Sequence, residues 1–408
     1  MAAITFCIAA SGTVFSQGDP AEKPKLKNFG SSLKRLKWDQ KQRKAVEKSS
    51  KTRPAQTDGD VIKVETKLVI TDALVLDGKG FAVSGLKVED FSVTEDGEQQ
   101  EVRFFSLGSD AKVPRSIVFI MDASASLLPV LDTSAEAAKK FVDRINPGDR
   151  VAIVNDRVKL VCNFTRDKTA LKNCIENIRK NRTVGFETGA SRQFSALMAS
   201  LRELFDDEDV RPIVILQADG DELPHLRRIH EPKPAFATSF GWRDIMGAAE
   251  RSRATIFTVY PTRRLLELPS AEQRRIAMDY YKNYDSSAVI NFALSRISGN
   301  RNPFPKDRAK MEEYFFTSFL EERLRQQNAF EELSNSTGGW AAYLESPAEA
   351  DEVYTRILTG IENRYVIGYY PSNETRDGKR RRIKVEVHGH PEYTIVGKRA
   401  YIAPGPQD

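Results

Sequence analysis

An apolar run that ends in a polar cluster constrains this fold more than any other stretch. Ile117 to Met121 are all apolar, and Asp122, Ser124 and Ser126 follow at alternate positions. An apolar run without polar alternation is typical of a strand buried on both faces, as in a parallel sheet covered by helices. Because ligands of open α/β sheets bind beyond the carboxyl ends of the strands, the three polar side chains are predicted to face a common point there.

A second buried strand ends in a similar polar corner. Ile213 to Leu216 is apolar, and the sequence Gln-Ala-Asp-Gly-Asp, which contains Asp219, follows it. Strand and helix patterns alternate over residues 114–362, which predicts a doubly wound, Rossmann-like α/β domain with a mostly parallel central sheet. In the strand order 3-2-1-4-5-6 the first and fourth strands are neighbours where the winding reverses. Asp122 and Asp219 are therefore predicted to meet, and their carboxylates with nearby hydroxyls suit a hard divalent cation.

The same residues resemble a known metal site. Asp122-Ala123-Ser124-Ala125-Ser126 is similar to the D-x-S-x-S motif of the metal-ion-dependent adhesion site, or MIDAS, of von Willebrand factor type A domains. Ala218-Asp219-Gly220 resembles that family's T-D-G corner, and Ser191 takes the place of its threonine. Ala125 and Ala218 differ from the usual Gly and Thr, at positions that do not normally supply a ligand atom. The resemblance implies that the metal ligands are Asp122, Ser124, Ser126, Ser191 and Asp219.

Segments outside this domain resemble one particular branch of the family. Gly85 to Phe91, Glu95 to Gln100 and Tyr365 to Pro371 are similar to the bacterial VWFA-related domain family that is frequent in acidobacteria. The likeness extends over about residues 61–404.

Two β-rich segments flank the α/β domain. Residues 60–108 and 363–404 show alternating apolar and polar residues between Asp-Gly turn signals. We expect them to form a small β-sandwich-like region into which the α/β domain is inserted, or which flanks it.

The amino-terminal part of the chain has a different composition. Residues 1–17 resemble the apolar core and cleavage site of a secretory signal without its basic start, which favours an exported protein at the cell surface, in the periplasm or secreted. Residues 18–58 are predicted to be a basic disordered arm, because they contain few apolar residues. Within it, residues 21–54 hold twelve Lys or Arg against three acidic residues, while the whole chain has a net charge of +5. This arm is interpreted either as a tether to an anionic envelope surface or as a solvated linker.

Two further features leave alternatives open. Cys162 and Cys174 are consistent with a disulfide in an exported protein or with two buried thiols, and they are too few for a zinc site. Residues 262–327 are long for a connection and are predicted to be a helical insertion that packs against the body or covers the metal cleft. No run of about 18 apolar residues predicts a transmembrane helix.

The function implied by the resemblance is metal-dependent protein binding. A partner's Asp or Glu carboxylate would complete the coordination of a divalent cation, Mg²⁺ first and Mn²⁺ or Ca²⁺ as alternatives. A scaffold or assembly factor with a structural metal is the alternative function, and a metal-dependent hydrolase is a third. Without a recognisable catalytic motif we expect no enzyme, and no nucleic acid as partner. The simplest opposing interpretation is that the serines and aspartates only cap local turns.

Overall fold

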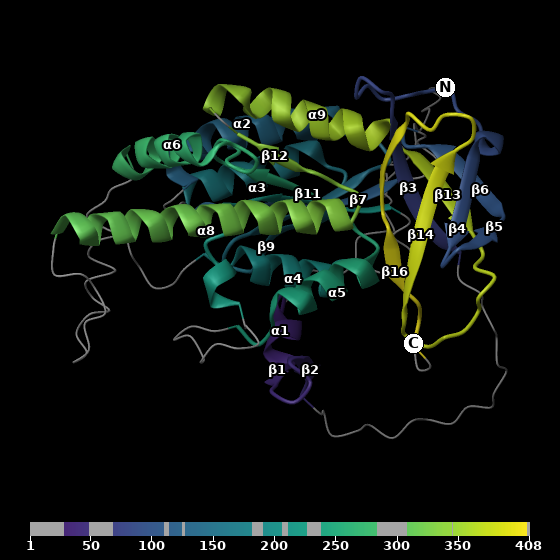
Figure 1. Ribbon diagram of the computed structural model, residues 1–408, viewed down its shortest axis with the longest axis horizontal. Helices are drawn as coiled ribbons and strands as arrows, with labels where there is room; N and C mark the ends of the chain where they lie inside the picture. Colours follow the sequence, from purple (N-terminus) through teal and green to yellow (C-terminus); the bar gives the residue numbers. More distant parts are fainter. Residues whose placement is uncertain are drawn as a thin grey trace, which may run out of the picture.

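A computed structural model describes residues 28–48, 68–109, 114–124, 127–181, 191–205, 211–226, 238–283, 308–344 and 346–405. Two bodies lie side by side in it, an α/β domain and a β-sandwich (Figure 1). Three short 3₁₀ helices, η1 (Val88–Asp90), η3 (Leu223–His225) and η4 (Pro347–Glu349), occur in connections.

The α/β domain is built on a six-stranded sheet. Its strands are β7 (Arg115–Met121), β8 (Arg150–Asn155), β9 (Lys159–Thr165), β10 (Arg211–Gln217), β11 (Thr255–Tyr260) and β12 (Ala341–Tyr343). The order is β12-β11-β10-β7-β8-β9, and every pair is parallel except β8 with β9. This is the predicted doubly wound order, and the fold class is confirmed.

Helices cover both faces of this sheet, which explains the unbroken apolar run of β7. One face packs against α2 (Leu128–Arg144), α3 (Lys168–Lys180) and α9 (Ala350–Glu362). The other packs against α4 (Gln193–Glu203), α5 (Trp242–Ser252) and the carboxyl-terminal half of α8 (Arg308–Ser336). Phe119 points into the first core and Val118 into the second, so alternate residues of one strand fill two separate cores.

The described part of the predicted insertion contains two helices. They are α6 (Ser270–Asn283) and α8, and they contact each other (Figure 1). α8 continues beyond residue 327 to Ser336, so the insertion and the helix that covers the sheet are one element. The side chains of α8 include Phe316 and Phe330, which are buried, and Tyr314, which is exposed.

The flanking β segments form one sandwich. Its sheets are β15-β3-β13-β6 and β16-β14-β4-β5, with all pairs antiparallel. The strands are β3 (Val69–Leu76), β4 (Phe91–Glu95), β5 (Glu98–Gln100), β6 (Val102–Leu107), β13 (Tyr365–Tyr369), β14 (Arg380–Val387), β15 (Thr394–Gly397) and β16 (Ala400–Ile402). Because β13 lies between β3 and β6, residues from both ends of the chain share one core, as predicted.

Buried arginines join the sandwich to the α/β domain. Arg364, which precedes β13, lies 3.2 Å from Asp72 of β3 and donates to the carbonyl of Gly338. Arg211, at the start of β10, donates to the carbonyl oxygens of Gly108 at 2.7 Å and Ile361 at 3.2 Å. The two bodies are therefore held by hydrogen bonds that cross their junction.

The prediction of a disordered arm over residues 18–58 is wrong for residues 28–48. These residues form α1 (Ser31–Arg35) and the hairpin of β1 (Leu36–Asp39) and β2 (Lys44–Glu47). The carboxylate of Glu203 on α4 accepts hydrogen bonds from the backbone N–H groups of Gly30 and Ser32, at 2.9 and 2.8 Å. Leu36 is buried in the core beside α4. The order comes from contacts distant in sequence, which local composition does not report; residues 1–27 and 49–67 lie outside the described part.

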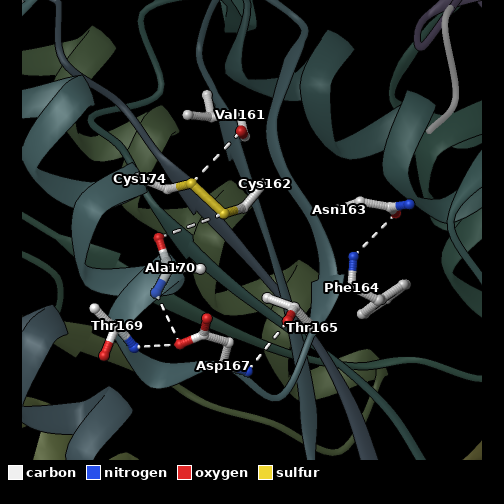
Figure 2. Close-up of a disulfide and its surroundings, with 9 residues drawn as sticks. All are labelled: Val161, Cys162, Asn163, Phe164, Thr165, Asp167, Thr169, Ala170 and Cys174. Atoms are coloured by element: carbon white, nitrogen blue, oxygen red, sulfur yellow. Dashed lines mark hydrogen bonds between the residues drawn. A yellow bond between two sulfur atoms is a disulfide. The ribbon is translucent and has the colours of Figure 1, made fainter. Parts of the chain in front are cut away.

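A disulfide joins Cys162 of β9 to Cys174 of α3 (Figure 2). Asp167 is the N-cap residue of α3. Its carboxylate accepts hydrogen bonds from the N–H groups of Thr169 and Ala170. Of the two alternatives for these cysteines, the structure shows the disulfide and not two free buried thiols.

Within the described residues, the helices are all too short or too polar to cross a membrane.

Candidate metal centre

Asp122 is the first residue after β7 and is fully buried. Its N–H donates to the carbonyl of Gln217 on β10 at 3.0 Å, which fixes the end of one central strand to the next. Its Oδ1 accepts from the N–H of Ser124 at 2.8 Å, a local turn bond. The local bond occupies one carboxylate oxygen and leaves Oδ2 directed to other groups.

Asp219 occupies the corresponding place after β10. Gln217 and Met121 are paired in register, so the two strands end side by side. Gly220 has a φ of +81°, and a Cβ there would lie 2.9 Å from Phe330, so the turn that follows requires glycine. Asp219 Oδ1 accepts from the N–H of Asp221 at 3.2 Å, whereas its buried Oδ2 has no hydrogen-bond partner among the described groups.

Three carboxylates meet at this corner. One oxygen from each of Asp122, Asp219 and Asp221 lies within 4.8 Å of the other two. Among the described residues this is the only cluster of acidic, His or Cys side chains that could hold a metal ion. Asp221 was not among the predicted ligands, although the Asp-Gly-Asp spelling after a buried strand was a signal for it.

The predicted serines have different outcomes. Ser191 lies beside the cluster: its Oγ is 2.9 Å from Asp122 Oδ2 and 2.7 Å from Gln193 Oε1, and its single proton can be donated to one of them at a time. Ser124 lies in the turn after Asp122 and is half-buried. Ser126 lies outside the described residues. The structure brings Asp122, Ser191 and Asp219 together. The set of five metal ligands stays a prediction.

Gln193 links the two sides of the site. It begins α4, and its Nε2 donates to Asp221 Oδ1 at 2.9 Å while its Oε1 faces Ser191. The side chain therefore orients one acid and one hydroxyl, a role that sequence reasoning missed because glutamine at a helix start carries no distinctive pattern.

Electrostatics disfavour this cluster without a cation. Burial, with the nearby charges of Asp156 and Asp219, raises the pKa of Asp122 well above its usual value. Burial, with the charges of Asp219 and Asp122, also raises the pKa of Asp221. Like charges in a desolvated site resist ionisation together, and a cation among them relieves this repulsion.

A fourth acid supports the site from behind. Asp156 follows β8, is buried, and accepts from the N–H of Ala123 at 3.3 Å. Burial raises its pKa too. Its hydrogen bond to the N–H of Ala123 holds the turn that carries Ser124. Its position at the end of the neighbouring parallel strand was the signal that could have found it.

Glu222 is a buried acid that belongs to the framework. Its Oε2 accepts from the N–H of Ser195 at 2.8 Å, and its Oε1 accepts from the Ser195 hydroxyl. Burial raises its pKa to about 7. These bonds tie the turn after β10 to α4 and thus position Asp221 relative to Gln193.

α8 brings a positive charge to the edge of the cluster. Arg323 Nη1 lies 4.0 Å from Asp219 Oδ2 and 3.3 Å from the hydroxyl of Tyr260. One guanidinium against three carboxylates leaves the corner negative. The insertion therefore reaches the candidate metal site. Among the described side chains of α8, only Arg323 forms an ion pair with the cluster.

The residues fit a divalent cation. Asp219 Oδ2 is a buried oxygen without a partner, Asp122 and Asp221 lie beside it, and all the nearby donors are hard oxygens. Local turn bonds account for one oxygen of Asp122 and one of Asp219, so the capping interpretation explains half of each carboxylate. Ser191 can account for the other oxygen of Asp122, and a metal would account for Asp219 Oδ2.

None of the described histidines belongs to the acidic cluster. His390 is exposed and its Nδ1 lies 2.9 Å from Glu392 Oε1, and His225 ends η3. His388 is in the sandwich, and His230 lies outside the described residues.

A doubly wound α/β domain with an acidic cluster at its switch point defines the class of this protein. A family model described as the von Willebrand factor type A domain matches residues 117–222, which contain both corners of the site. This part of the chain therefore matches a von Willebrand factor type A (VWA) domain. Such domains typically mediate protein–protein interaction or adhesion, and often bind a divalent cation.

Solved structures similar to this chain include three from bacterial proteins. An aerotolerance-related membrane protein from Bacteroides fragilis and BatB from Bacteroides thetaiotaomicron each share 14% identity, covering 60% of this chain and 98% of theirs, with a TM-score of 0.33. The vWF domain of the type V pili tip protein Mfa5 from Porphyromonas gingivalis shares 13% identity, covering 61% and 96%, with a TM-score of 0.33. No curated protein sequence matches the chain significantly.

Proposed function

We propose that this protein is a metal-ion-dependent interaction module that binds an acidic residue of a partner protein through a divalent cation. The observation that carries the proposal is the buried Asp219 Oδ2, which has no hydrogen-bond partner among the described groups and lies beside two other carboxylates. An orphaned buried oxygen in a polar site calls for an ion or a water. The pKa directions at Asp122 and Asp221 favour a cation over a water.

Mg²⁺ is the proposed cation, with Mn²⁺ as its usual experimental substitute and Ca²⁺ as a weaker fit. Asp122, Asp219 and Ser191 would hold it, with Asp221 nearby and Ser124 on the adjoining turn. Ser126, outside the described residues, stays a predicted ligand. Mg²⁺ keeps several water ligands when protein donors are few. An external Asp or Glu carboxylate can displace one of these waters, which makes the cation the point of attachment.

We infer binding and not catalysis. The candidate ligands among the described residues are the carboxylates of the cluster and the hydroxyl of Ser191. The nearby buried acid Glu222 already accepts two hydrogen bonds from Ser195, so it is engaged in the framework. General-base catalysis needs a group within hydrogen-bond reach of an activated water.

We further propose that the protein is exported to the cell envelope or beyond. The Cys162–Cys174 disulfide supports this, because disulfides persist in oxidising compartments and are rare in the cytosol.

A carboxylate-dependent capture experiment tests the function. The immobilised chain is incubated with cell-envelope extract in Mg²⁺ or in EDTA, and with Asp122→Ala or the exposed control Asp132→Ala. We expect the same partner to be retained by the wild type and the control in Mg²⁺, and lost with EDTA or Asp122→Ala. Blocking the partner's carboxylates by amidation should also abolish retention. Equal retention in EDTA would instead favour a scaffold, and hydrolysis of a partner that Asp219→Ala abolishes would favour an enzyme.

A further inference from the structure

A hollow of the described surface lies on the sandwich, away from the acidic cluster. It has a volume of about 630 Å³ and is bounded by β14, by the turn between β4 and β5, and by the residues that join β15 to β16. Its charged lining residues are Arg380, Arg382, Lys384, Lys398, Arg399 and Asp96. Five positive groups against one carboxylate make this hollow strongly basic.

One wall is a row of cations on β14. Arg380, Arg382 and Lys384 are alternate residues and are all exposed, so they share the outer face of the strand. Alternate residues of a strand lie roughly 6.7 Å apart. The row can therefore meet a ligand whose negative groups are spaced by a similar distance.

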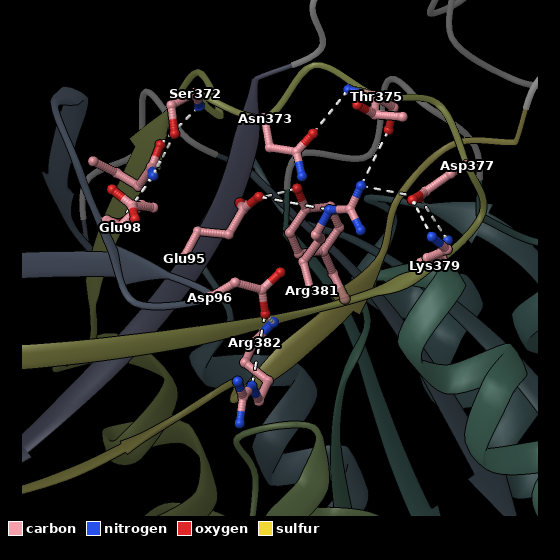
Figure 3. Close-up of polar contacts among 12 residues, drawn as sticks. Glu95, Asp96, Glu98, Ser372, Asn373, Thr375, Asp377, Lys379, Arg381 and Arg382 are labelled. Atoms are coloured by element: carbon pink, nitrogen blue, oxygen red, sulfur yellow. Dashed lines mark hydrogen bonds and ion pairs between the residues drawn. The ribbon is translucent and has the colours of Figure 1, made fainter.

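The acidic groups nearby satisfy this row only in part. Arg380 Nε lies 2.9 Å from Glu250 and Lys384 Nζ lies 2.7 Å from Glu386, so each has one acidic neighbour. Asp96 is 3.7 Å from the Arg382 guanidinium, and its Oδ1 already accepts from the Arg382 N–H at 2.9 Å (Figure 3). Each cation of the row therefore has one acidic neighbour, and the excess positive charge of the hollow comes from Lys398 and Arg399.

The opposite wall carries the more unusual residue. Lys398 is only 6% exposed, and its Nζ has no hydrogen-bond partner among the described groups. A buried ammonium without a partner is costly unless an anion or a water accepts from it. The adjacent Arg399 is exposed, whereas Lys398 also lines a small cavity with Asp72 and Arg253, whose charges act on it.

We propose that this hollow binds a ligand carrying two or more phosphate or sulfate groups. Arginine presents a planar fork of donors that matches such oxyanions, and three of the five cations are arginines. The volume falls within the range of small-molecule sites. The site is separate from the metal centre in position and in charge, so it does not depend on the function proposed above.

Tripolyphosphate is the probe for the test, measured by titration calorimetry on the full chain. We expect it to bind the wild type, and Arg382→Ser with Arg399→Ser to weaken it at least tenfold. Arg103→Ser is the matched control, since Arg103 is an exposed arginine on the other sheet. Lys398→Met is a second variant that tests the buried cation, with expected loss of the same order and an unchanged fold by circular dichroism.

Two further probes distinguish the sources of the oxyanion. A heparin fragment that binds more tightly than tripolyphosphate, with the same dependence on Arg382 and Arg399, would assign a polyanionic chain. Tripolyphosphate that binds at least as tightly would assign a small ligand. Anionic phosphatidylglycerol vesicles should not bind through this hollow, because a flat bilayer does not enter it. Binding to vesicles alone, or tripolyphosphate binding unchanged in the double variant, would overturn the proposal.

Discussion

At the residue scale, single buried charges explain most of what is unusual in this protein. Asp219 is a buried anion with an unpartnered oxygen, and Lys398 is a buried cation with an unpartnered nitrogen. Arg323 lies 4.0 Å from Asp219 Oδ2 and the charge of Asp72 acts on Lys398, but neither group makes a hydrogen bond to these atoms, and buried charges are costly without one. The two residues lie in different bodies of the molecule, so each calls for its own ligand.

Lys398 should make stability depend on alkaline pH. Burial lowers its pKa from 10.5 to about 7, so between these values the unfolded chain binds a proton that the folded chain does not. The free energy of unfolding therefore rises with pH across this window, by about 3–5 kcal/mol. Lys398→Met should remove the rise and increase stability at pH 7. Urea unfolding between pH 7 and 10 measures this.

The exposed Lys379 supplies the control for that measurement, because its side chain is 75% exposed. Lys379→Met should keep the wild-type slope. The same slope in wild type and Lys398→Met would show that another group titrates.

At the element scale, strands place the ligands and one inserted helix modifies them. The carboxyl ends of β7 and β10 position Asp122 and Asp219, while α8 brings Arg323 to within 4.0 Å of Asp219. A fixed positive charge competes with a cation for the same carboxylate. We therefore propose that the helical insertion lowers the affinity of the candidate site for a cation.

Replacing this arginine should strengthen metal binding. Arg323→Gln removes the competing charge, so Mn²⁺ affinity should rise three- to thirtyfold, equivalent to about 1–2 kcal/mol. Arg325→Gln is the matched control, since Arg325 is exposed on the same helix and pairs with Glu322. Unchanged affinity in Arg323→Gln would mean that α8 does not regulate the site. Calorimetric titration with Mn²⁺ gives both values.

The disulfide should stabilise the outer edge of the α/β domain. It joins β9 to α3 across a sequence separation of 12 residues. In the chain-entropy model a loop of this length contributes about 2–3 kcal/mol. Cys162→Ala with Cys174→Ala should lower the free energy of unfolding by that amount in urea. The variant should also become insensitive to dithiothreitol, and a loss of stability on reduction in it would contradict this assignment.

The ends of buried strands were predictable, and the contacts between distant segments were not. Apolar runs located β7 and β10, and the doubly wound order then predicted that Asp122 and Asp219 meet. Arg323 is about a hundred residues further along the chain, and nothing in its local pattern places it there. The order of residues 28–48 was also not predictable from local sequence, because their hairpin depends on contacts with Glu203 and with the core beside α4.

At the scale of the whole molecule, the chain passes from the sandwich into the α/β domain and returns. β13 completes the sheet to which β3 and β6 belong, so the sandwich needs residues from both sides of the α/β domain in the sequence. The Arg364 and Arg211 hydrogen bonds cross the junction between them. We therefore expect the sandwich and the α/β domain to unfold together as one cooperative unit and not as two independent domains.

Breaking the junction should destabilise both bodies. Arg364 is 1% exposed, and Arg364→Gln leaves Asp72 without its ion-pair partner, at a cost of about 3–5 kcal/mol. Amide hydrogen exchange should then accelerate in β13 and in β10 alike. Arg399→Gln, an exposed change in the same body, should leave both unchanged. Faster exchange confined to β13 would show that the two bodies unfold separately.

The central claim is that Asp122 and Asp219 hold a divalent cation with a coordination position open to a carboxylate. Water-proton relaxation in the presence of Mn²⁺ tests it directly, because enhancement reports a bound ion that still carries exchangeable water. We predict enhancement with the wild type, its decrease on adding acetate or an Asp-containing peptide, and at least about hundredfold weaker Mn²⁺ binding in Asp122→Ala. An absence of enhancement, or an equal enhancement in Asp122→Ala, would contradict the account.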